Sequence, residues 1–125
     1  KANKISWARN ELPLKEFLDT EKAVGMGKTL VSYFGDPNRE GTEAVSTALA
    51  NLKAFTLVGF QTRLPEFQLG LSSVLKMPLP TTRVNRSPNS SEAEKIQADP
   101  GAMRAIREMC ELDLDLWDKV TAWSR

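Results

Sequence analysis

Apolar residues recur at helical spacing through most of the chain, and this pattern predicts a mainly helical protein. One or two helices are predicted over residues 13–34, with one apolar face made by Ala23, Gly27, Leu30, Val31 and Phe34. The stretch 35–41, "GDPNREG", then breaks the pattern with glycine, proline and asparagine. Thr42 is the predicted cap of the next helix, which has a stripe made by Val45, Ala48, Leu49 and Leu52.

Residues 55–60, "FTLVGF", are rich in aromatic and β-branched side chains, and they predict a short buried strand. Pro65 suits the first turn of the helix that follows, whose apolar positions are Phe67, Leu71, Val74 and Leu75. The middle of the chain therefore has the helix, strand, helix order of an α/β protein. A lone strand has no partner within this sequence, so either 55–60 is not a strand or its sheet lies outside the chain.

Residues 78–91, "PLPTTRVNRSPNSS", contain three prolines and no regular period, which predicts a loop. A long terminal helix is predicted to follow, with Asp99 as its N-cap and Pro100 at the first helical position. Its apolar face is formed by Met103, Ile106, Cys110, Trp117 and Val120, flanked by Met109, Leu112, Leu116 and Trp123. The predicted fold class is mainly α with at most one or two short strands, in a single domain or domain fragment over 1–125.

The composition indicates an ordinary globular protein, because 41% of the residues are hydrophobic and 26% are charged. Lys and Arg number 17 against 16 Asp and Glu, so no nucleic-acid or membrane partner is expected from charge. No stretch resembles a membrane span or a signal peptide. A soluble, cytoplasm-like protein is expected, although the sequence identifies neither compartment nor organism.

Histidine is absent, which removes the commonest general base and the commonest zinc ligand. Cys110 is the only cysteine, so the chain alone cannot form a disulfide, a thiolate zinc site or a Cys/His pair. No metal site is expected. The spacing of Cys110 from Ile106 and Trp117 predicts a thiol that packs in the core.

The Gly-Lys-Thr sequence at 27–29 matches the end of a phosphate-binding P-loop. The first glycine of that motif would fall at Lys22, and the preceding residues have a helical pattern where a P-loop requires a strand. We therefore interpret this stretch as a helix that passes close to a neighbour at Gly25 and Gly27.

The loop at 78–91 is the strongest candidate for phosphate binding. It carries Arg83 and Arg86, follows Lys76, contains no acid, and is rich in hydroxyl and amide side chains, including Thr81, Thr82, Asn85, Ser87, Asn89, Ser90 and Ser91. Arginine offers paired donors to phosphate oxygens, and small polar residues can satisfy the remaining ones. The alternative is an ordinary polar surface loop.

Asp113 falls on the apolar stripe of the predicted terminal helix. A carboxylate there needs a hydrogen-bonding partner, because burying an unpaired charge costs several kcal/mol, on the order of its desolvation penalty. We expect a structural role, in which Asp113 accepts hydrogen bonds from backbone N–H groups or from an arginine.

The order of "ALANLKAFTLVGFQTRLPEFQLGL", the polar basic loop and "IREMCELDLDLWDKVTAW" resembles the C-terminal half of sulfotransferases that use the sulfate donor PAPS, especially the carbohydrate O-sulfotransferase branch. The resemblance covers about residues 42–123 and implies the C-terminal part of the α/β, P-loop-like sulfotransferase fold. The matching positions are Leu52, Phe55, Val58, Gly59, Ile106, Leu112, Asp113 and Leu116, and Trp117 replaces a tyrosine.

The resemblance implies that PAPS is the cofactor and that its 3′-phosphate is held by Arg83, Asn85, Arg86 and Ser87. Thr62 stands where the family has an acid, so the role of that acid is not carried over. The family's 5′-phosphosulfate loop and its usual base lie upstream of the matched region and are not found in this chain. No catalytic residue is assigned, and transfer to a hydroxyl acceptor is expected only if those elements are supplied.

A second interpretation remains open, in which the chain is a non-catalytic helical interaction or oligomerising module. It would use the unpaired strand or an apolar face to bind a partner or a second copy. A third interpretation is an unrelated all-helical domain, which predicts that residues 55–60 are helical or irregular. The acceptor substrate and the oligomeric state do not follow from the sequence.

Overall fold

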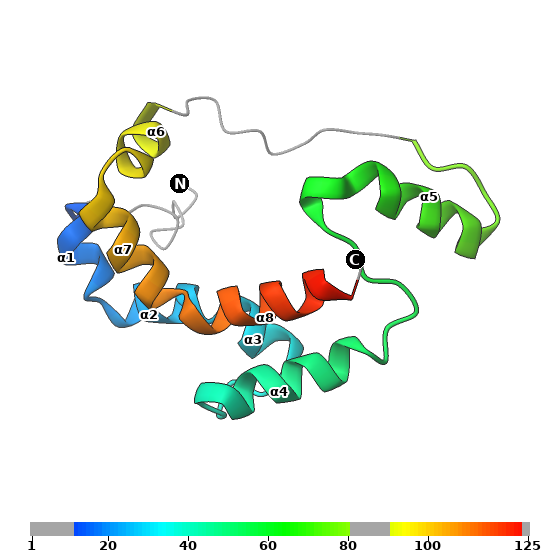
Figure 1. The fold of residues 1–125 in the computed structure, drawn as a ribbon, viewed down its shortest axis with the longest axis horizontal. Helices are drawn as coiled ribbons and strands as arrows, with labels where there is room; N and C mark the ends of the chain where they lie inside the picture. Colours follow the sequence, from blue (N-terminus) through cyan, green and yellow to red (C-terminus); the bar gives the residue numbers. More distant parts are fainter. Residues whose placement is uncertain (1–11, 81–90, 124–125) are drawn as a thin grey trace, which may run out of the picture.

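The computed structural model describes residues 12–80 and 91–123, which fold into helices with short connections (Figure 1). In chain order the elements are α1 (Leu14–Leu18), α2 (Glu21–Gly27), α3 (Thr29–Phe34), α4 (Gly41–Leu52), the 3-10 turn η2 (Gln61–Arg63), α5 (Leu64–Leu75), α6 (Ser91–Gln97), α7 (Pro100–Met109) and α8 (Glu111–Ala122). These two ranges contain no strand, and the mainly α prediction is confirmed for them. None of their helices combines the length and the apolar character needed to cross a membrane.

The core lies where α3, α4 and α8 pack together. Its buried side chains are Val31, Ala44, Val45, Ala48, Leu52, Leu116 and Val120. Two of the α4 positions are alanines, and the small side chains bring the helix backbones close. The predicted stripe of α4 is confirmed by the burial of Val45, Ala48 and Leu52.

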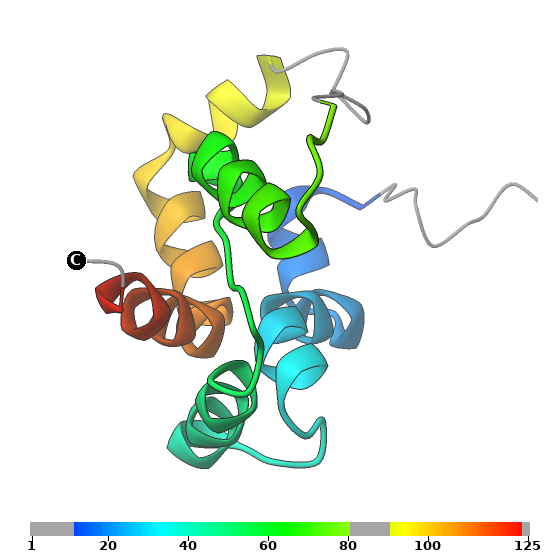
Figure 2. The ribbon, with the colours of Figure 1, turned by 90° about the vertical axis from the view of Figure 1, so that its right-hand side faces the viewer.

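A second group of helices surrounds α7, which contacts α1, α2 and α6 (Figures 1 and 2). Gly27 ends α2 against the last turn of α7, where an added Cβ would overlap the carbonyl oxygen of Met109. The prediction of a close approach is therefore confirmed at Gly27. It is wrong at Gly25, where a Cβ would meet open space.

Residues 55–60 are not a strand, which corrects the prediction of a short buried strand. Phe60 has extended backbone angles, φ −116° and ψ 136°, but within the described ranges no backbone hydrogen bond involves residues 56–59. The predicted burial is also wrong, because Phe55 is 56% exposed and none of residues 55–60 is fully buried. An irregular segment here is what the interpretation as an unrelated all-helical domain predicts. The side chains of the segment nevertheless alternate, because Val58 and Phe60 pack on the core while Leu57 and Gly59 face α5.

The predicted terminal helix is interrupted at Cys110, which ends α7 and precedes α8. Cys110 has backbone angles of φ −94° and ψ 12°, outside the helical range, and the bend lets α7 pack on α1 and α2 while α8 crosses α3 and α4. The start of this region is as predicted. The carboxylate of Asp99 accepts hydrogen bonds from Gly101 N and Ala102 N, and Pro100 occupies the first turn.

The helices differ from the prediction in three other places. Residues 13–34 hold three short helices instead of one or two, because α2 and α3 are separated at Lys28. Thr42 does not cap α4, which already begins at Gly41; this glycine has φ +56°, a left-handed angle that glycine adopts at little cost. Helix α6 was not predicted, because it buries no residue and so leaves no apolar stripe in the sequence.

Candidate functional site

The residues predicted to bind a phosphate, Arg83, Asn85, Arg86 and Ser87, lie outside the described residues. The structure describes the two flanks of their loop. Helix α5 ends at Leu75, and Lys76 follows it with a left-handed backbone, φ 56° and ψ 38°. Helix α6 begins at Ser91 on the other flank. The phosphate-binding role of the four residues remains a prediction.

The stretch that matched the end of a P-loop forms the junction between α2 and α3. The Thr29 hydroxyl donates a hydrogen bond to Met26 O at 2.7 Å. This bond to a carbonyl three residues earlier is typical of a helix. The residues before Gly27 belong to helix α2, so the strand that precedes a P-loop is not present there. This part of the chain has the helical geometry that the sequence analysis favoured over phosphate binding.

The Asp113 side chain, which belongs to α8, caps the N-terminus of α3. Its Oδ2 accepts a hydrogen bond from Leu30 N and its Oδ1 accepts one from Val31 N, both at 2.9 Å. The first N–H groups of a helix have no partner within the helix, and a carboxylate satisfies them while opposing the positive end of the helix dipole. The predicted structural role is confirmed, and these N–H groups are no longer free to bind an anion.

Cys110 lies half-buried at the bend between α7 and α8. It is less buried than the core thiol that its spacing predicted, because the helix bends at this residue. Burial raises the pKa of the Cys110 thiol, and the negative charge of Asp113 raises it further. The folded chain therefore favours the neutral thiol. This contribution to stability is present below the pKa of the unfolded thiol and is lost as the pH rises through the folded pKa.

Two apolar hollows flank the segment 57–60 where it crosses the core. The Trp123 hollow has a volume of about 350 Å³ and walls that include Phe55, Phe60 and Trp123. The smaller Trp117 hollow, about 100 Å³, lies against Trp117 and Leu30. The Phe60 and Trp117 rings meet edge to face with centroids 5.2 Å apart, so Phe60 forms a wall of both hollows.

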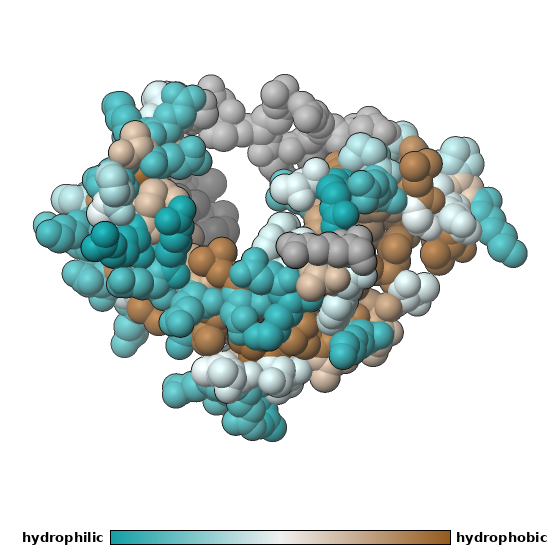
Figure 3. Space-filling model, in the orientation of Figure 1, coloured by the Kyte–Doolittle hydropathy of each residue, from teal (hydrophilic) through white to brown (hydrophobic). Residues whose placement is uncertain are grey.

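Helix α5 adds to the apolar surface at the same end of the molecule, seen as brown at the right of Figure 3. It buries no residue, and it packs on the segment before it through Phe67 against Gly59 and Gly70 against Leu57. Of the predicted stripe, Phe67 and Leu71 are partly buried, whereas Val74 and Leu75 are 52% and 50% exposed. The chain therefore covers only the first half of this stripe.

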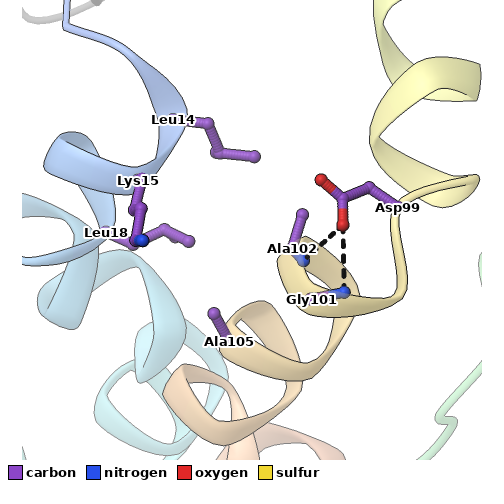
Figure 4. A pocket seen from close by; sticks show the side chains of 7 residues that line it. All are labelled: Leu14, Lys15, Leu18, Asp99, Gly101, Ala102 and Ala105. Atoms are coloured by element: carbon purple, nitrogen blue, oxygen red, sulfur yellow. Dashed lines mark hydrogen bonds between the residues drawn. The ribbon is translucent and has the colours of Figure 1, made fainter.

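A groove of about 530 Å³ separates α1 from α7 (Figure 4). Leu14, Leu18 and Ala105 give it apolar walls. Asp99 lies at its rim, but its carboxylate already caps α7 through Gly101 N and Ala102 N. The Asp99 carboxylate thus has a structural role, and Lys15 is the other charged residue that lines the groove.

No group of three metal-ligating side chains lies together in the described ranges. Comparisons of the chain with protein-family models, with curated proteins and with solved structures gave no match.

Proposed function

We propose that this chain is the C-terminal part of a sulfotransferase-like protein and helps to hold the 3′-phosphate of PAPS. One observation carries the proposal: most of the residues that define the resemblance also hold the helices together, and Phe55, which is 56% exposed, is the exception. Leu52 and Leu116 are buried in the core, and Asp113 joins α8 to α3. Val58 packs on that core, and Trp117 contacts the neighbouring Phe60.

Burial of the matched apolar residues is what common architecture would give, although apolar residues lie in the core of any helical fold. The specific part of the support is Asp113, whose carboxylate joins two helices. In this chain the Leu-Asp-x-x-Leu sequence at 112–116 supplies a core contact, a helix-capping carboxylate and a buried leucine in one turn. The two residues of the Val-Gly pair contact neighbours on opposite sides of the segment. Val58 packs on the core, and Gly59 packs against the ring of Phe67.

The donor groups of the proposed phosphate-binding residues fit a phosphate. Arg83 and Arg86 each carry a guanidinium with paired donors, while Asn85 and Ser87 add an amide and a hydroxyl. The segment 78–91 contains no carboxylate that would repel the anion. PAPS would supply the activated sulfuryl group, and these residues would bind and orient the nucleotide end of that donor.

The proposal assigns binding and no catalytic step to this chain. Sulfuryl transfer needs an in-line acceptor, a base for its hydroxyl and cations near the bridging oxygen. The resemblance places the residues for these tasks upstream of the matched region. We therefore expect nucleotide binding without turnover.

Calorimetric titration with adenosine 3′,5′-bisphosphate tests the proposal. We expect weak binding that is lost in Arg83→Ala/Arg86→Ala and kept in the control Arg104→Ala/Arg107→Ala, which removes two exposed arginines from α7. Adenosine 5′-monophosphate should bind more weakly, because it lacks the 3′-phosphate. A folded chain that gives no binding heat, or equal losses in both double variants, would contradict the proposal.

The exposed end of the apolar stripe of α5 favours a second candidate, a helical module that pairs with a second copy. Val74 and Leu75, near the end of α5, and Met77, just after it, are 52%, 50% and 54% exposed. If this surface is the contact, sedimentation velocity should show a monomer–dimer equilibrium that Val74→Asp shifts to monomer. A chain that stays monomeric at high concentration would count against this candidate.

A further inference from the structure

The segment 56–60 has the surroundings of a strand inside a layered protein, but no strand lies beside it in the part of the chain that the structure describes. Its side chains alternate between two sets of helical contacts. Val58 and Phe60 pack on the core made by α3, α4 and α8, whereas Leu57 and Gly59 face α5. Figure 2 shows the segment as a continuous stretch that runs from α4 to α5. Both faces of the segment are therefore covered by helices of this chain.

The hydrogen-bonding edges of the same segment are open. Among the described residues, the only backbone hydrogen bond within 56–60 is that of Phe60 O, which accepts from Arg63 N at 2.9 Å. Backbone N–H and C=O groups in an extended segment point sideways, between the two faces. A helix cannot satisfy such a row of groups, whereas an adjacent extended chain about 4.8 Å away can.

The hollows beside the segment indicate what the side chains of that neighbour should be. The Trp123 and Trp117 hollows lie next to Val58 and Phe60, on the core face. A strand paired with 56–60 would place every second side chain on this face. The Trp117 hollow is lined by aliphatic and aromatic residues and Gly59, whereas the Trp123 hollow also has one charged residue, Lys53, in its wall. Residues 55–60 carry no charge, and most of the lining is apolar, so an uncharged strand with alternating apolar residues fits best.

We propose that residues 56–60 are a docking edge for an extended, uncharged β-strand from another polypeptide segment. Main-chain hydrogen bonds to Thr56–Phe60 would hold the strand, and its alternate apolar side chains would fill the two hollows, as in β-strand addition. The inference does not rest on nucleotide binding. Either test can succeed while the other fails.

The experiment uses the full ¹⁵N-labelled chain and a synthetic peptide, acetyl-Lys-Thr-Val-Thr-Val-Thr-Val-Lys-amide. Its alternating valines can occupy the hollows, and its terminal lysines keep it soluble. We expect the peptide to shift the amide signals of residues 56–60 and to slow hydrogen exchange at least tenfold at alternate amides, those on the paired edge. Amides at the distant contact of α2 with α7 should not change.

A matched peptide separates strand pairing from apolar contact. The same peptide with every Thr and Val amide nitrogen methylated keeps the side chains but cannot donate along either edge. It should bind at least tenfold more weakly. Equal binding would overturn the proposal, because the hollows alone would then account for the affinity.

Two variants at one exposed position make the same test by changing the protein instead of the peptide. Thr56→Pro removes one N–H from the edge, whereas Thr56→Val keeps it with a side chain of similar shape. We expect Thr56→Pro to weaken peptide binding at least tenfold and Thr56→Val to leave it nearly unchanged. If Thr56→Pro loses its helical circular dichroism, the methylated peptide decides the question.

Two outcomes would contradict the proposed occupant. Unchanged amide signals at 56–60 with excess peptide, in a chain whose core signals stay dispersed, would show that the edge does not accept a strand. Shifts at 56–60 that depend on protein concentration without peptide would identify a second copy of the chain as the occupant instead.

Discussion

At the scale of single residues, Asp113 connects parts of the chain that are far apart in sequence. Its two oxygens accept hydrogen bonds from Leu30 N and Val31 N, more than 80 residues away. We expect Asp113→Ala to lower the free energy of unfolding by about 1–2 kcal/mol, because two N–H groups lose their cap. Asp113→Asn should cost less, since one side-chain oxygen remains to accept. Urea unfolding followed by circular dichroism measures both changes.

The control for Asp113 is Asp118→Ala, which removes an exposed carboxylate from the same helix. It should change the free energy of unfolding by no more than about 0.5 kcal/mol, as is usual for surface substitutions. If Asp113→Ala is no more destabilising than this control, the two hydrogen bonds contribute nothing to stability.

Asp113 also shows how much of a single residue's role can be predicted from the sequence. Its need for a partner followed from a charged side chain on an apolar stripe. The identity of the partner did not, because the two N–H groups belong to the start of α3, whose boundary depends on the break at Lys28. Cys110 gives the opposite result: its position on the stripe indicated burial, but the bend at this residue leaves it half-exposed.

At the scale of elements, the contact of α2 with α7 depends on one glycine. A Cβ at Gly27 would overlap Met109 O and lie 2.9 Å from Met109 C, and a carbonyl in a helix cannot easily move. We expect Gly27→Ala to destabilise the fold by about 1–3 kcal/mol, the usual cost of overpacking. Chemical denaturation of the purified variant measures the loss.

Gly25 provides a matched control for this contact, because it lies two residues away in the same helix with open space around it. Gly25→Ala should stabilise the fold by about 0.5–1 kcal/mol, since alanine loses less backbone entropy in a helix than glycine does. If Gly25→Ala and Gly27→Ala change the free energy of unfolding in the same direction, α2 and α7 do not meet as closely as described.

The elements also show why periodicity predicts some features and misses others. The aromatic and β-branched residues at 55–60 predicted a buried strand, but a strand is defined by its backbone partners, and local sequence does not supply them. Helix α6 has an exposed Glu92–Lys95 pair and no apolar stripe, so a search for hydrophobic spacing passes over it. The candidate phosphate residues were identified from side-chain chemistry and from the family resemblance, and neither determines their spacing in three dimensions.

At the scale of the whole molecule, the free energy of local opening should differ between parts of the chain. The buried side chains gather where α3, α4 and α8 meet, with Val31, Val45 and Leu116 each only 2% exposed. Helix α5 buries nothing and is held through its contacts with Leu57 and Gly59. Regions with few buried apolar contacts open at lower free energy than the core does.

Native-state hydrogen exchange should therefore resolve two levels within this chain. We expect amides in the middle of α5 to exchange at least tenfold faster than those of α4, a difference of about 1.4 kcal/mol in opening free energy. Leu116→Ala, which empties a core position, should speed exchange in α4 far more than Leu69→Ala, whose side chain is 74% exposed. Binding of a strand at 56–60 should slow exchange in α5 as well, because α5 packs directly on that segment. Equal protection of α5 and α4 in the free chain would mean that α5 is already covered, and the proposed pairing of α5 with a second copy would then lose its physical basis.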